Sequence, residues 1–66
     1  MPVELAPRLA DPDGVFAALV AAHDGLDPAA SRRLDAALIL LLANHIGDDG
    51  VVLDAIKVAQ SAEAGT

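Results

Sequence analysis

The chain has 66 residues, 55% of them hydrophobic, with ten acidic and four basic side chains and a formal net charge of −6. A chain of this length holds one small domain, which buries only about 60% of the surface that its unfolded form exposes. The negative charge and the lack of Trp and Tyr argue against nucleic-acid binding, which needs basic groups and aromatic platforms. The absence of cysteine excludes disulfides, thiolate metal ligands and thiol nucleophiles.

Membrane insertion and export also find no support in the sequence. The longest unbroken apolar run extends from Ala36 to Ala43, far short of the roughly 20 residues needed to cross a bilayer. Residues 1–10 lack the basic start and the continuous apolar stretch of a signal peptide. The acidic balance also repels anionic membrane surfaces. We therefore expect a soluble, cytoplasmic protein.

The first segment, residues 1–10, is expected to be an extended arm. Pro2 and Pro7 disfavour a helix there, and Val3 and Leu5 alternate as residues do at the edge of a sheet.

Capping signals then divide the chain into three predicted helices. A carboxylate before the first helical turn accepts hydrogen bonds from free backbone amides, and a proline suits the first helical position. These carboxylates are Asp11 before Pro12, Asp27 before Pro28, and Asp48 or Asp49 for the last helix. Gly25 and Gly47 stand where a residue of positive φ closes a helix. The prediction is a single domain over 11–62, with helices at about 12–24, 28–46 and 49–62 and a frayed tail at 63–66.

The connections between these helices are short, which favours antiparallel neighbours. The predicted fold class is therefore all-α, a three-helix up-down-up arrangement with the extended arm in front, completed by dimerisation. Dimerisation is expected because so short a chain gains little from burying its own side chains.

The predicted helix at 28–46 carries more apolar surface than two short neighbours can cover. Leu34, Leu38 and Leu41 already form one stripe, and Leu40 points almost the opposite way. One interpretation is a central helix between the other two, with Leu40 singly exposed. The favoured one is a second chain packed on this helix, because contiguous exposed apolar patches mark interfaces. The predicted interface residues are Ile39, Leu40, Ala43 and Ile46.

His23 and His45 both fall in the last turn of a predicted helix, where a positive charge favours the helix dipole. This structural role needs no catalysis. A metal or acid–base site would combine His45 with Asp48 and Asp49, or His23 with Asp24 and Asp27, but neither group supplies a convincing third ligand. We therefore expect no catalytic residue, no metal and no cofactor.

The adjacent pair Arg32 and Arg33 lies near the predicted start of the second helix, where positive charge is mildly unfavourable. Asp24, Asp27 and Asp35 are close enough in sequence to offset it. A surface salt-bridge cluster is the favoured interpretation, and a docking contact for an acidic partner is the alternative.

Two segments, at 17–27 and 38–48, contain His-Asp-Gly-Leu-Asp and Ala-Asn-His-Ile-Gly-Asp. Over roughly 11–60 the chain resembles a family of small bacterial proteins known only as a domain of unknown function. The resemblance implies short, helical, cytoplasmic proteins whose genes lie beside flavin-dependent hydroxylases of aromatic compounds. Such a hydroxylase is thus one candidate protein partner. The resemblance also draws attention to Asn44, His45 and Asp48 as a functional surface at the turn between the second and third helices.

Three functional hypotheses follow. The first is a small non-enzymatic interaction protein, a homodimer or an accessory subunit, that acts through the apolar second helix. The second is a ligand- or metal-binding protein or an enzyme with a site at Asn44, His45 and Asp48. The third is a regulatory partner that is partly unfolded until bound, although the high apolar content argues against full disorder.

Overall fold

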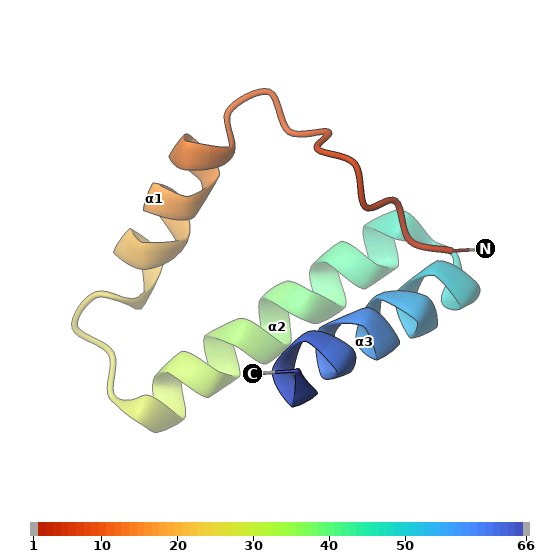
Figure 1. Cartoon of the computed structure of the whole chain (residues 1–66). Helices are drawn as coiled ribbons and strands as arrows, with labels where there is room; N and C mark the ends of the chain where they lie inside the picture. Colours follow the sequence, from red (N-terminus) through yellow and green to blue (C-terminus); the bar gives the residue numbers. More distant parts are fainter. Residues whose placement is uncertain (1, 66) are drawn as a thin grey trace.

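A computed structural model describes residues 2–65, and within that range the chain forms three α-helices and no strand (Figure 1). The helices are α1 (Pro12–His23), α2 (Pro28–Ile46) and α3 (Asp49–Ala64). The predicted all-α class is confirmed. The predicted arm at 1–10 and tail at 63–66 include residues 1 and 66, which lie outside the described residues. No helix within 2–65 has both the length and the apolar character needed to span a membrane.

An aspartate caps the start of each helix, as predicted. The Asp11 carboxylate accepts from the Gly14 amide at 3.0 Å, and Asp27 accepts from the Ala30 amide at 2.8 Å. Of the two candidates for the third helix, Asp48 is the cap, and it accepts from the Val51 amide at 3.1 Å. Pro12 and Pro28 stand at the first helical positions, where their missing amide proton costs nothing.

The helix ends differ from the prediction in one place. Gly47 closes α2 with a φ of 68°, and Gly25 follows α1 with a φ of 78°, both as predicted. The third helix, however, continues to Ala64 and does not fray from residue 63. Glu63 and Ala64 are good helix formers, and no glycine interrupts the chain between Gly50 and Gly65.

The arrangement of the helices is more open than three packed helices would be. The helices α2 and α3 lie side by side as an antiparallel hairpin, whereas α1 stands apart from them (Figure 1). The connection from α1 contains a tight turn, in which the Leu26 amide donates to the His23 carbonyl at 3.2 Å, and Asp27 then leads into α2 with an extended backbone. This connection does not lay α1 against the hairpin (Figure 1).

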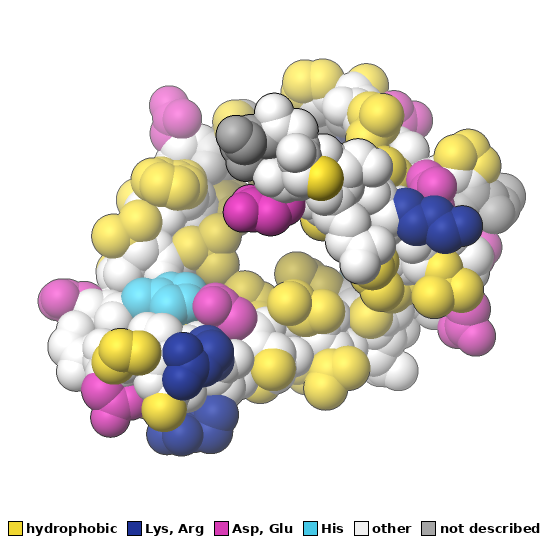
Figure 2. Space-filling view, turned by 60° about the horizontal axis from the view of Figure 1, so that its bottom comes forward, with side chains coloured by type: hydrophobic (Ala, Val, Ile, Leu, Met, Phe, Trp, Pro, Cys, Tyr) yellow, Lys and Arg dark blue, Asp and Glu magenta, His cyan; other side chains and the backbone are white. Residues whose placement is uncertain are grey.

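The described part of the chain has no buried core. None of its residues is buried, and large apolar side chains on all three helices are exposed. The radius of gyration is 13.4 Å, against about 11 Å for a compact chain of this length. The space-filling view shows an opening through the molecule with hydrophobic side chains along part of its rim (Figure 2). The helices are well formed, but they enclose almost nothing.

Candidate functional site

The most conspicuous chemical feature is the apolar surface of α2. Three of its predicted interface residues are largely exposed, Ile39 at 62%, Leu40 at 69% and Ile46 at 51%. The fourth, Ala43, is half-buried. Leu41 and Leu42 are also exposed, so the apolar surface is wider than the predicted set. The helical periodicity assigns Leu41 to the stripe of Leu34 and Leu38 and does not single out Leu42.

One side of the α2–α3 hairpin is hollowed into an apolar groove, called here the hairpin groove, with a volume of about 300 Å³. Ile39, Ala43 and Ile46, three of the four predicted interface residues, line it. Ala55 and Ala59 contribute small side chains from α3. The complete lining is Ile39, Leu42, Ala43, Ile46, Val52, Ala55, Ile56 and Ala59.

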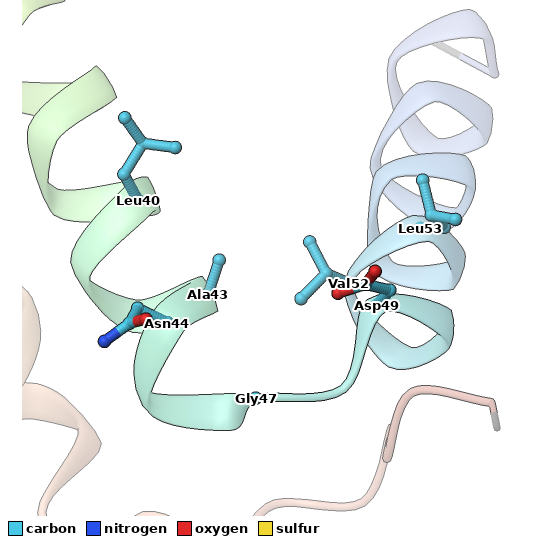
Figure 3. Close-up of a pocket in the computed structure, with 7 residues that line it drawn as sticks. All are labelled: Leu40, Ala43, Asn44, Gly47, Asp49, Val52 and Leu53. Carbon is cyan, nitrogen blue, oxygen red and sulfur yellow. The ribbon is translucent and has the colours of Figure 1, made fainter.

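Another hollow, of about 600 Å³, lies at the closed end of the hairpin (Figure 3). Leu40 and Asn44 line it from α2, and Asp49 and Leu53 line it from α3. Ala43 and Val52 point toward each other between the two helices and border both this hollow and the hairpin groove (Figure 3). Leu40 thus faces a different hollow from Ile39 and Ile46, and Ala43 borders both hollows.

The residues of the predicted turn site have different surroundings. Asn44 lines the hollow just described, whereas the carboxylate of Asp48 caps α3 and borders the N-terminal arm. His45 is exposed and lines neither this hollow nor the hairpin groove. In the part of the chain that the structure describes, no group of three or more His, Cys, Asp or Glu side chains is placed to hold a metal ion.

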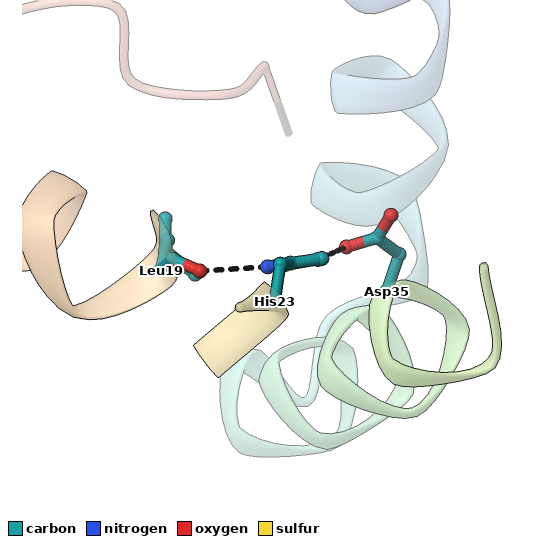
Figure 4. Close-up of polar contacts among 3 residues, drawn as sticks. All are labelled: Leu19, His23 and Asp35. Atoms are coloured by element: carbon teal, nitrogen blue, oxygen red, sulfur yellow. Dashed lines mark hydrogen bonds and ion pairs between the residues drawn. The ribbon is translucent and has the colours of Figure 1, made fainter. Parts of the chain in front are cut away.

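His23 joins α1 to α2 (Figure 4). Its Nδ1 lies 2.6 Å from the carbonyl oxygen of Leu19, and its Nε2 lies 2.6 Å from Oδ1 of Asp35. The hydrogen bond to the Leu19 carbonyl, followed by the interaction with Asp35, raises the pKa of His23 above its ordinary value of 6.5. The sequence suggested Asp24 and Asp27 as neighbours of this imidazole. Asp35 was missed because an antiparallel α1 would not bring His23 level with it.

The expected arginine–aspartate cluster is wrong. Asp35 instead forms an ion pair with His23, at 2.6 Å. The Asp27 carboxylate caps α2 by accepting a hydrogen bond from the Ala30 amide. Arg32 and Arg33 are exposed at the start of α2 and form no ion pair with these carboxylates.

The N-terminal arm returns to the hairpin. The Val3 amide donates to Oδ2 of Asp54 at 2.7 Å, across a sequence separation of 51 residues. Asp54 is half-buried beside the arm. The arm forms no sheet within the described residues, so the strand-like alternation of Val3 and Leu5 does not mark a sheet edge. Arm and α1 thus make one continuous frame that is attached to the hairpin near both ends.

Comparison with known proteins identifies a family whose function is unknown. No curated protein and no solved structure matches the chain. One family model, described as "Protein of unknown function (DUF2783)", matches residues 3–61 and so includes most of the arm, α1, α2 and α3 up to residue 61. The membership of a family of unknown function that the sequence predicts is therefore confirmed: this chain belongs to the DUF2783 family.

Proposed function

We propose that this protein is a non-enzymatic interaction subunit that associates with a second copy of itself through the apolar surface of α2. The observation that carries the proposal is the absence of any buried residue in the described chain. Burial of apolar surface is the main favourable term in folding, so a chain without a fully buried residue gains stability when another molecule covers its exposed apolar side chains. A symmetric dimer is the commonest way to do so.

The exposed area supports association on this scale. The chain exposes 5589 Å². A compact folded monomer of 6.7 kDa would expose about 3,900 Å². The surplus is about 1,700 Å² per chain, whereas a stable interface of standard size needs only about 800 Å² from each partner.

The chemistry of the surface also fits an interface. Ile39, Leu40 and Ile46 offer branched aliphatic groups without charge, and Ala43 lets another chain approach closely. Charged groups are depleted from the centres of protein interfaces, as they are here. Asn44, His45 and Asp48 do not converge, so this proposal gives the turn no chemical role.

Two aspartate substitutions test the proposal. Ile39→Asp and Leu40→Asp each place a charge on the α2 surface at a position that is already exposed, so neither substitution removes packing within one chain. The mass of the assembly, measured by light scattering after size exclusion, should fall toward that of one chain. Leu5→Asp, on the exposed arm, is the matched control and should leave the mass unchanged. An unchanged mass for both α2 variants would sink the proposal.

A further inference from the structure

The hairpin groove has the shape and the lining of a binding groove for a helix. Its lining is apolar, and the small side chains of Ala43, Ala55 and Ala59 leave room for close approach. The lining residues run from Ile39 to Ile46 on α2 and from Val52 to Ala59 on α3, a rise of about 10 Å along each helix. A third helix of at least two turns would fit this length.

The helix α1 has matching chemistry but does not lie in the groove of its own chain. It has 12 residues and is therefore about 18 Å long. Its apolar stripe is exposed, with Phe16 at 68%. The members of this stripe, called here the α1 stripe, are Val15, Phe16, Leu19 and Val20.

The attachments of the frame keep α1 out of its own groove. Asp35, Ile39 and Ile46 lie on one face of α2, because they are spaced by four and seven residues. His23 at the end of α1 is bound to Asp35, and the arm lies against Ile46. The frame thus meets the groove side of α2 at Asp35, near the middle of the helix, and at Ile46, its last residue, and it leaves Ile39 and Leu42 uncovered between them.

We propose that the α1 stripe of a second copy fills the hairpin groove, and that the two chains exchange α1 reciprocally in a symmetric dimer. In such a dimer each chain covers both its groove and its α1 stripe. This larger contact accounts for the surplus exposed area of about 1,700 Å² per chain better than a single patch of about 800 Å² does. The exchange completes a three-helix core from two chains. This inference rests on the self-association proposed above and names the segments that form it.

Cysteine pairing tests the exchange directly, because the chain contains no cysteine of its own. One preparation carries Ala59→Cys in the groove. A second, labelled with a heavy nitrogen isotope, carries a single cysteine at one position of the α1 stripe, Val15, Phe16, Leu19 or Val20 in turn. After mixing and mild oxidation, mass spectrometry identifies disulfides between the two preparations, which form only where Cα atoms come within about 7 Å.

We expect at least one stripe position to pair with Ala59→Cys several-fold faster than Ala17→Cys or Ala21→Cys, which lie on the opposite side of α1. Equal rates at stripe and control positions would overturn the exchange. Self-association is checked first, from the mass of the unmodified protein. A dimer with equal rates refutes the exchange alone, whereas a monomer refutes the proposed function as well.

A substitution in α1 provides an independent readout. Phe16→Glu should raise the dimer dissociation constant at least about tenfold, because large aromatic anchors dominate interface energies. Ala17→Glu, one position along the same helix, should leave the constant nearly unchanged. Both positions are exposed in the single chain, so neither substitution removes packing within it. Equal dissociation constants for the two variants would contradict the exchange.

Discussion

His23 makes two hydrogen bonds that together fix its charge. Its Nδ1–H donates to the Leu19 carbonyl and its Nε2–H donates to Asp35, both at 2.6 Å. A neutral imidazole carries one ring proton, so the two bonds form together only in the imidazolium ion. The same contacts, the Leu19 carbonyl first and Asp35 second, raise the pKa of His23. Deprotonation of His23 therefore removes one of these two hydrogen bonds, because the neutral ring keeps a single N–H.

The sign of the pH dependence follows from this shift. Because the folded-state pKa lies above the unfolded value of 6.5, the stability that His23 contributes is complete below pH 6.5 and is lost as the pH rises through the folded pKa. In Asp35→Asn, we expect the pKa of His23 to fall only part of the way toward 6.5, since the Leu19 carbonyl remains. An NMR titration of the His23 ring measures both values. A pKa at or below 6.5 in the unaltered protein would contradict this account.

Asp48 has a structural role in the turn between α2 and α3, because it caps α3. Its carboxylate accepts the Val51 amide at 3.1 Å and so satisfies one of the free donors at the start of α3. Gly47, just before it, takes the left-handed conformation that ends α2. The motif at 44–48 is therefore explained, in large part, by the geometry of ending one helix and starting the next.

The capping role predicts a specific pattern of substitutions at the element scale. Asp48→Ala should lower the free energy of unfolding by about 1 kcal/mol, whereas Asp48→Ser, which keeps an acceptor, should recover most of it. Urea unfolding at one fixed chain concentration measures the change, since association makes stability depend on concentration. If Asp48→Ser is as destabilised as Asp48→Ala, the carboxylate has a role other than capping.

The helices could be predicted from sequence because their signals are local. Asp27 before Pro28 and Gly47 after Ile46 bracket α2 at the bounds that the structure shows. The position of α1 could not be predicted in this way, because it depends on His23 meeting Asp35 and on Val3 meeting Asp54, 51 residues away. Neither contact has a periodic or capping signature. Periodicity marks the excess apolar surface of α2, but it does not show that Leu40 and Ile39 face different hollows.

At the scale of the whole molecule, the single chain consists of well-formed helices that leave most of their apolar side chains unpacked. It exposes 5589 Å², about 1,700 Å² more than a compact monomer of its mass. At roughly 25 cal/mol per Å² of apolar surface, covering even half of that surplus would contribute some 20 kcal/mol, before the costs of association. Folding and association should therefore be coupled in this protein.

Sedimentation equilibrium of the untagged protein across a wide dilution series tests this coupling most directly. The account predicts a mass of about 13 kDa, twice the 6.7 kDa of one chain, with helicity falling at the dilution where the dimer dissociates. A mass of 6.7 kDa at every concentration, with full helicity and a cooperative unfolding transition, would contradict it.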